Sequence, residues 1–243
     1  MSKLAVFCLL LLLLALLTAC GAAAPTAIPS AVPPSPTASA TPTITPTPRP
    51  VPPALEPASK LSPGCDQLQS FTARPMVPGQ LAIDFALKDT KGKAYTLSSL
   101  LAKKPVVLIF GSSTSVPFRQ QYASDNTLFQ KYGDRASIMI IYSKEANPIE
   151  QNPAQFSRDA RGTPITQPTT YEQRVMLATR MISETKTTIP VLVDDIDNPL
   201  WCSYGRMANS AFLISTDGRI VLRQDWHDAA RLERDLRQYL GIW

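Results

Sequence analysis

The sequence predicts an α/β protein whose folded part is a three-layer sandwich around a mixed central sheet. Short apolar runs bounded by proline or glycine alternate with longer segments of helical spacing, which is the pattern of buried strands joined by helices. The last two strand-like runs flank a tight turn and precede an amphipathic segment. This ending indicates a terminal hairpin followed by a helix.

The first half of the domain is expected to contain two short strands and then longer, buried ones. In chain order the expected elements are a strand at Ile83–Leu87, a strand at Tyr95–Leu97, a helical turn at Ser98–Lys103, a strand at Pro105–Phe110, a helix at Pro117–Tyr132 and a strand at Ser137–Tyr142. The runs PVVLIF and SIMIIY are almost entirely apolar and too short for helices, so both are expected to be buried. The helix between them stops before Gly133.

The second half of the domain repeats this alternation. In chain order the expected elements are an irregular stretch at residues 147–168, a helix at Tyr171–Ser183, a strand at Ile189–Val193, a short helix at Asn198–Gly205, strands at Ala211–Ser215 and Ile220–Arg223, and a helix at His227–Leu240. Asp217-Gly218 marks the hairpin turn. Parallel strands joined by helices, closed by a hairpin and a helix, are the arrangement of the thioredoxin kind of sandwich.

The N-terminus predicts export and lipid anchoring. Lys3 precedes the apolar run Leu4–Leu17, which is typical of a secretory signal and shorter than the roughly 20 residues of a membrane-spanning helix. The run ends in LTACG, which resembles a bacterial lipobox and implies cleavage before Cys20 and acylation of its thiol, for example with palmitate. We therefore expect residues 1–19 to be a signal peptide and the mature protein to be held on the outer face of a bacterial cell membrane. The alternative is an ordinary signal peptide with an incidental Cys20.

Residues 20–63 are expected to be an extended tether. Of the 23 prolines in the chain, 13 fall between Gly21 and Pro63, in a stretch rich in alanine, threonine and serine. Prolines at this density prevent helix and sheet, and few residues in the stretch could fill a core. The folded domain is therefore expected at residues 64–243. A proline-rich docking ligand is the alternative for the tether.

Composition excludes several classes of site. The only histidine is His227, which we expect to be exposed near the start of the last helix, so a histidine-rich metal site is excluded and no metal or cofactor is expected. The formal charge is +5, but lysine and arginine are scattered without a long basic run, which argues against nucleic acid as a partner.

Two cysteines, Cys65 and Cys202, remain in the expected domain. An exported chain meets an oxidising environment, so a disulfide between them is plausible. The alternative is that Cys202 is a displaced redox thiol.

Several segments resemble a known family. The segment DFAL at 84–87 resembles the beginning of redoxin-type thioredoxin-fold proteins, which include thiol reductases and peroxiredoxins. The stretch GSSTSVPFR at 111–119 is similar to the active turn of iodothyronine deiodinases, Gly-Ser-Cys-Thr-selenocysteine-Pro-Pro-Phe. YSKEANP at 142–148 is similar to the family's Tyr-x-x-Glu-Ala-His-Pro, and IPVLVD at 189–194 to its Pro-Val-Val-Val-Asp strand. The resemblance covers roughly residues 78–240 and implies a thioredoxin fold and an oxidoreductase.

The chain departs from the family at the positions that carry its chemistry. Ser115 stands at the nucleophile position and Ser113 at the upstream cysteine. Phe118 leaves no resolving thiol, Asn147 replaces the histidine, and Ala208 replaces the usual proline before the late strand. A thiolate or selenolate at a helix N-terminus can attack a disulfide or a carbon-bound iodine, whereas a serine oxygen cannot cycle between reduced and oxidised forms.

Two functional hypotheses follow. The resemblance implies an oxidoreductase by descent, a reductive dehalogenase or thiol oxidoreductase with Ser115 at the nucleophile position and Tyr142 and Glu145 as a proton relay. Arg119 would hold an anion or pair with Glu145 in this case. The alternative is a redox-inactive binding or scaffold lipoprotein that holds a small aromatic or halogenated ligand, a thiol partner or a protein partner. Ser115 would then be the N-cap of the following helix.

Overall fold

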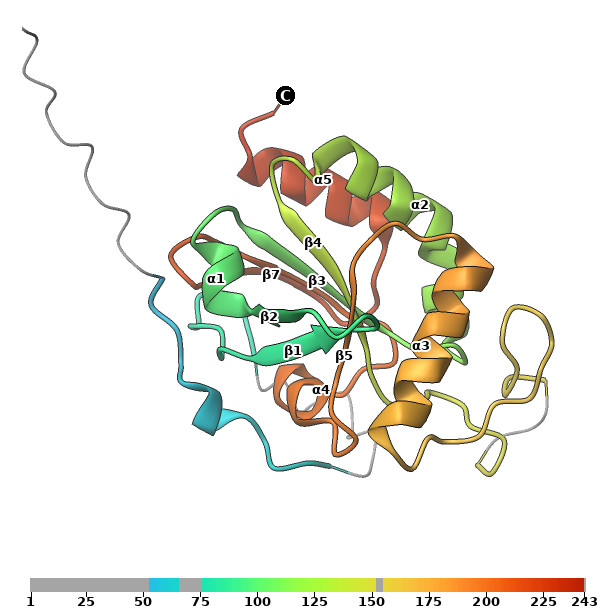
Figure 1. Cartoon of the computed structure of the whole chain (residues 1–243). Coiled ribbons are helices and arrows are strands. Elements are labelled where there is room, and N and C mark those ends of the chain that lie inside the picture. Colours follow the sequence, from blue (N-terminus) through green and yellow to red (C-terminus); the bar gives the residue numbers. More distant parts are fainter. Residues whose placement is uncertain (1–52, 66–75, 152–154, 243) are drawn as a thin grey trace, which may run out of the picture. The chain divides into compact units, whose positions relative to one another are not determined.

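The computed structural model describes residues 53–65, 76–151 and 155–242 (Figure 1). All of them belong to one compact unit, Pro48–Trp243. The predicted signal peptide, the lipidation site Cys20 and most of the predicted tether lie outside the described residues. Within the described ranges, no helix is long and apolar enough to cross a membrane.

Seven strands in the described part of the chain form one mixed sheet in the order β2-β1-β5-β4-β3-β6-β7. Their bounds are β1 Ala86–Asp89, β2 Ala94–Thr96, β3 Val106–Gly111, β4 Ser137–Tyr142, β5 Val191–Val193, β6 Ala211–Ile214 and β7 Ile220–Gln224. Strands β3, β4 and β5 are parallel, and the strands outside them pair antiparallel. The carboxyl ends of β3 and β4 therefore meet at one edge of the sheet.

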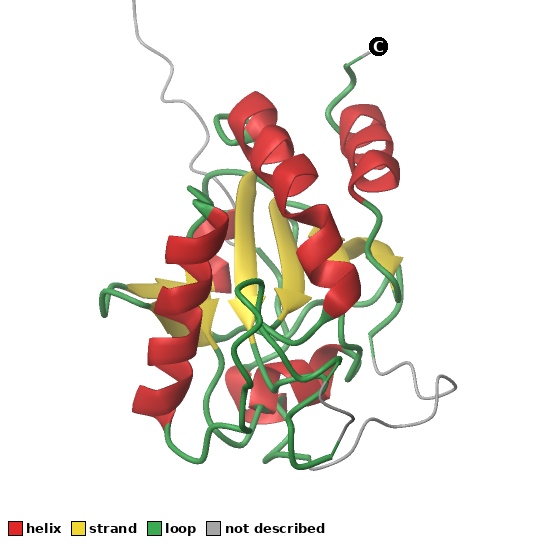
Figure 2. Ribbon diagram, turned by 90° about the vertical axis from the view of Figure 1, so that its right-hand side faces the viewer, coloured by secondary structure: helices red, strands yellow, loops and turns green. Residues whose placement is uncertain are grey.

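Helices cover both faces of this sheet. Their bounds are α1 Leu97–Leu101, α2 Val116–Tyr132, α3 Tyr171–Thr185, α4 Pro199–Tyr204 and α5 Ala229–Tyr239, with a short 3₁₀ helix at Ala58–Lys60. The core on one face takes residues from α1 and α4, and the core on the other takes residues from α2, α3 and α5, which lie in front of the strands in Figure 2. Alternate residues of β3 point into opposite cores, Leu108 into the first and Ile109 into the second. The predicted three-layer thioredoxin-like sandwich is confirmed.

The last part of the predicted tether lies on the domain. The amide of Ala54 donates to the Asp217 carbonyl at 3.1 Å, and the amide of Glu56 donates to the Ala82 carbonyl at 2.9 Å. Leu55 packs against the core. Gly218 makes this approach feasible, since a Cβ there would lie 1.8 Å from the Ala54 carbonyl oxygen. Residues 54–56, which by composition look like part of a linker, thus form a strap across the hairpin between β6 and β7.

His227 is buried, so the expectation of an exposed histidine is wrong. Helix α5 begins only at Ala229, with Asp228 as its N-cap, and the preceding loop turns inward. The His227 amide donates to the Asn209 carbonyl at 3.0 Å, which directs the ring between α2 and α5. There Nε2 lies 2.7 Å from Asp125 Oδ1, and both side chains are almost fully buried.

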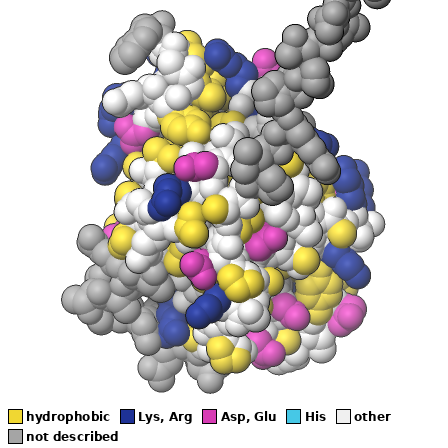
Figure 3. All heavy atoms as spheres, turned by 90° about the vertical axis from the view of Figure 1, so that its left-hand side faces the viewer, with side chains coloured by type: hydrophobic (Ala, Val, Ile, Leu, Met, Phe, Trp, Pro, Cys, Tyr) yellow, Lys and Arg dark blue, Asp and Glu magenta, His cyan; other side chains and the backbone are white. Residues whose placement is uncertain are grey.

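The face of the molecule shown in Figure 3 carries lysine and arginine interspersed with aspartate and glutamate. No broad single-sign patch stands out on this face.

Candidate functional site

The turn between β3 and α2 is the position at which the family resemblance places the chemistry. It runs from Ser112 to Ser115, and all four of its side chains are buried, with at most 4% exposed. Gly111 at its start is required by packing, since a Cβ there would lie 2.3 Å from the ring of Phe118. The turn is closed by the Ser115 amide, which donates to the Ser112 carbonyl at 3.1 Å.

Ser115 occupies the N-cap position of α2, as the capping interpretation expects, and a proline lies in the first turn of that helix. Its hydroxyl, however, makes no capping hydrogen bond. Ser115 Oγ is buried and has no hydrogen-bond partner among the described residues. A serine nucleophile needs a neighbouring base to remove its proton, and no such base touches this hydroxyl in the described structure.

Tyr142 and Glu145 do come together with the turn. The Tyr142 hydroxyl is hydrogen-bonded to the Glu145 carboxylate and to Ser113 Oγ, the latter at 2.8 Å. The other Glu145 oxygen accepts from the Thr114 amide at 2.9 Å and from its hydroxyl at 2.7 Å. A buried network therefore joins the end of β4 to the start of α2.

This network holds protons firmly. Burial raises the pKa of Glu145, and the hydrogen bonds from Tyr142 and Thr114 only partly oppose that effect. Burial and the neighbouring carboxylate raise the pKa of Tyr142 well above its ordinary value. Burial therefore favours the neutral, proton-bearing form of both groups more than it is favoured in exposed groups of the same kind.

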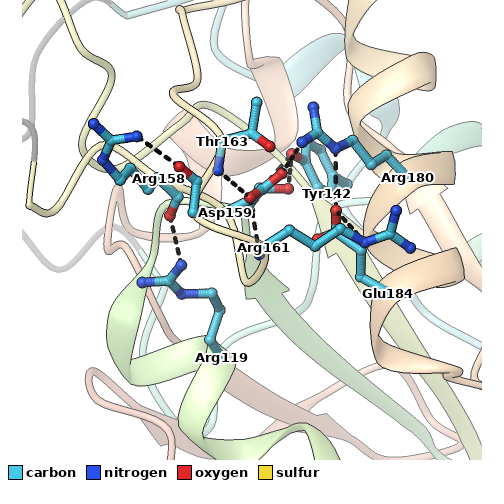
Figure 4. Close-up of polar contacts among 10 residues, drawn as sticks. Arg119, Tyr142, Arg158, Asp159, Arg161, Thr163, Arg180 and Glu184 are labelled. Carbon is cyan, nitrogen blue, oxygen red and sulfur yellow. Dashed lines mark hydrogen bonds and ion pairs between the residues drawn. The ribbon is translucent and has the colours of Figure 1, made fainter.

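Asn147 and Arg119 support the turn instead of facing a reactant. The Asn147 side-chain amide donates to the Thr114 carbonyl at 2.9 Å, and its backbone amide donates to Thr114 Oγ1 at 3.0 Å. The Arg119 guanidinium donates to the Arg158 carbonyl at 2.5 Å (Figure 4), not to Glu145 as one expectation had it.

Two buried charged residues near this network escaped the sequence analysis. Arg174, in the first turn of α3, donates to backbone carbonyls that follow β5, at 3.2 Å for Asp194. The Asp194 carboxylate accepts the amides of Leu200 and Trp201 at the start of α4, at 3.3 and 2.9 Å. Burial raises the pKa of Asp194 to about 6. Asp194 ends the family-like segment at 189–194, but nothing in the spacing of either residue indicated burial.

Cys65 and Cys202 form a disulfide with a Cα–Cα distance of 5.9 Å. It fastens the segment before β1 to α4 across 137 residues of chain. Neither sulfur is therefore a free thiol, which favours the structural interpretation over a displaced redox thiol. In the described ranges, no group of three or more histidine, cysteine, aspartate or glutamate side chains could hold a metal ion.

Comparisons with known proteins agree with this picture. The family model described as iodothyronine deiodinase matches residues 79–240. Thyroxine 5-deiodinase of Sparus aurata is 29% identical over 125 residues, which are 51% of this chain and 45% of that protein. Thyroxine 5-deiodinase of Gallus gallus is 28% identical over 115 residues, which are 47% of this chain and 43% of that protein. The chain thus spans about half the length of these curated relatives.

Among solved structures, one reported as the thiol:disulfide interchange protein DsbE of Chlorobium tepidum has a TM-score of 0.50 and 19% identity. The match covers 68% of this chain and 97% of that chain. At this identity the likeness shows the thioredoxin-like fold.

Proposed function

The chain belongs to the iodothyronine deiodinase family, and from this premise we propose that it is a redox-inactive member that binds a small phenolic or halogenated aromatic ligand. The single observation that carries the proposal is the state of Ser115. Its hydroxyl stands where the family has its nucleophile, yet it is buried and unpartnered in the described structure. An oxygen in that position, without a base, supplies neither a thiolate nor a two-electron couple.

The remainder of the turn supports a binding role. The Tyr142 hydroxyl and the Glu145 carboxyl lie together at the N-terminal end of α2, and the pKa of each is raised by burial. Such a pair can donate a hydrogen bond to a phenolic oxygen, and the positive end of the helix favours the partial negative charge on that oxygen. The turn would therefore keep the recognition half of a deiodinase-like site.

Anchoring belongs to the same proposal. We place the binding domain outside a bacterial cell membrane, held through acyl chains on Cys20, because the LTACG motif directly follows an apolar signal-like run. The proline-rich segment would separate the domain from the lipid surface.

Calorimetric titration of the full chain with an iodinated phenol tests this function. Tyr142→Phe should weaken binding by about tenfold because it removes one hydrogen bond from a desolvated site. Tyr132→Phe is the matched control, because the Tyr132 hydroxyl bonds Glu233 at 2.9 Å on another part of the surface. Absence of binding by the wild type, or equal affinity in the two variants, would sink the proposal.

A second candidate is an oxidoreductase by descent, favoured by the retained Tyr142–Glu145 pair. It requires a redox sulfur, and the Cys65–Cys202 disulfide is the one bond in the described domain that could supply it. Dithiol-driven turnover by the wild type would support this candidate.

A further inference from the structure

A loop between β4 and α3 lies against the first turn of α2. We define this cover loop as residues 155–165. The Arg119 side chain, one turn into α2, donates to the Arg158 carbonyl of the loop at 2.5 Å (Figure 4). Within the loop, the Ile165 amide donates to the Ser157 carbonyl at 2.9 Å, and the Ile149 amide donates to the Ile165 carbonyl at 2.9 Å. The loop therefore connects α2 with the segment that carries Glu145 and Asn147.

The cover loop is stiff because of one buried carboxylate. Asp159 Oδ1 accepts the amides of Arg161 and Thr163 at 2.9 and 2.8 Å, which closes a tight turn. The other oxygen of Asp159 is ion-paired with Arg180 on α3 (Figure 4). Only 1% of the Asp159 side chain is exposed, against 34% for Arg180.

The ion pair is the point at which the cover loop is fastened to α3. Arg180 is held in turn by Glu184, whose Oε1 lies 3.0 Å from Arg180 Nε. The same carboxylate lies 3.5 Å from Nε of Arg161 in the loop. Residues 160–164 at the tip are exposed, whereas Ser157 and Ile165 at the base are buried. A loop with an exposed tip, a buried base and a charged fastening can move as one piece.

The turn and the Glu145 carboxylate are closed to solvent. Ser115 and Thr114 have no exposed surface, and Glu145 has 2%. No ligand can reach these groups in the closed arrangement. We propose that the cover loop is a lid, fastened by Asp159–Arg180, which must lift from the start of α2 before the turn meets solvent or ligand. The identity of the ligand rests on the proposed function, whereas the movement of the lid does not.

The test measures access without a ligand. Ser115→Cys in the full chain introduces a thiol under the lid, and its alkylation rate is followed by mass spectrometry of the peptide that contains position 115. We expect slow labelling compared with Ser183→Cys, a serine-to-cysteine change at an exposed position on α3. Adding Arg180→Ala to Ser115→Cys should raise the rate about tenfold, because the closed state loses its charged fastening.

Controls keep the test decisive. Lys131→Ala removes an exposed ion pair with Glu233, remote from the loop, and should leave the rate unchanged. Arg180→Lys keeps the charge but not the planar guanidinium, so it should give an intermediate rate and serves if Arg180→Ala does not fold. Without the added thiol, the backbone amides of residues 112–115 should exchange hydrogen faster in Arg180→Lys than in the wild type.

Two results would overturn the lid. Labelling of Ser115→Cys as fast as Ser183→Cys would mean that the turn is open in solution. An unchanged rate and unchanged exchange in the folded Arg180 variants would mean that the ion pair does not control access. Either result would leave the proposed binding function to be judged by its own titration, because no phenol is present in this experiment.

Discussion

Removing the Cys65–Cys202 disulfide should cost much of the stability of the domain. The bond joins positions separated by 137 residues. The chain-entropy relation for a closed loop of this length gives about 5 kcal/mol at 25 °C, close to the upper end of measured effects. The double variant Cys65→Ser/Cys202→Ser avoids leaving a single reactive thiol.

Urea unfolding of the wild type and the double variant, followed by tryptophan fluorescence, measures this effect. The free energy of unfolding should fall by about 5 kcal/mol. The slope of this free energy against urea concentration should steepen, because the unfolded chain is no longer cross-linked and exposes more surface. Wild type treated with a strong dithiol should resemble the double variant. A loss below about 1 kcal/mol, or a titratable thiol in native untreated wild type, would refute the view of this bond as a structural staple.

Three further changes test the packing around the site. Burial raises the pKa of Asp194 from 3.8 to about 6, so the folded state binds this proton more tightly than the unfolded chain does. Stability should therefore fall by about 2 kcal/mol between pH 4 and pH 6, and Asp194→Asn should flatten that slope in urea titrations. Asp125→Ala removes the buried hydrogen-bond partner of His227 Nε2 and should cost about 1–3 kcal/mol in thermal or urea unfolding, whereas an unchanged stability would contradict a buried hydrogen bond between them. Gly111→Ala forces a Cβ into the ring of Phe118 and should cost at least about 1–3 kcal/mol; an unchanged melting temperature would contradict the close contact.

The local pattern was enough to predict the fold. The runs that became β3 and β4 are almost entirely apolar, and both faces of β3 are indeed covered. The helix between them ends where glycine stops it. The spacing of apolar residues, together with the glycines and prolines that end the elements, is sufficient to predict them here, because each element is buried through its own apolar residues.

The contents of the site were predictable only in part. The family resemblance predicted that Tyr142 and Glu145 act together at the turn, and in the structure their side chains are hydrogen-bonded to each other there. Arg174 was not predicted to be buried, because its partners are backbone carbonyls beyond β5 that a sequence does not place beside α3. His227 was misplaced for a similar reason, since its burial depends on the distant Asp125.

The strap before β1 illustrates the same limit. Leu55 and Leu61 are isolated apolar residues among prolines, so composition assigned them to the tether. Their burial depends on the hairpin turn, which lies more than 150 residues later, and on the disulfide at Cys65. Contacts between segments so far apart leave no periodic signal in either segment.

We propose above that the turn has lost its redox chemistry while keeping its shape. The most direct measurement is dithiol-driven release of iodide from an iodinated phenol by the full chain, comparing wild type, Ser115→Cys and the control Ser183→Cys. We expect no turnover above background for wild type and Ser183→Cys, and measurable turnover for Ser115→Cys, since a thiol at the start of α2 regains a lowered pKa and a two-electron couple. Turnover by the wild type would contradict a redox-inactive turn.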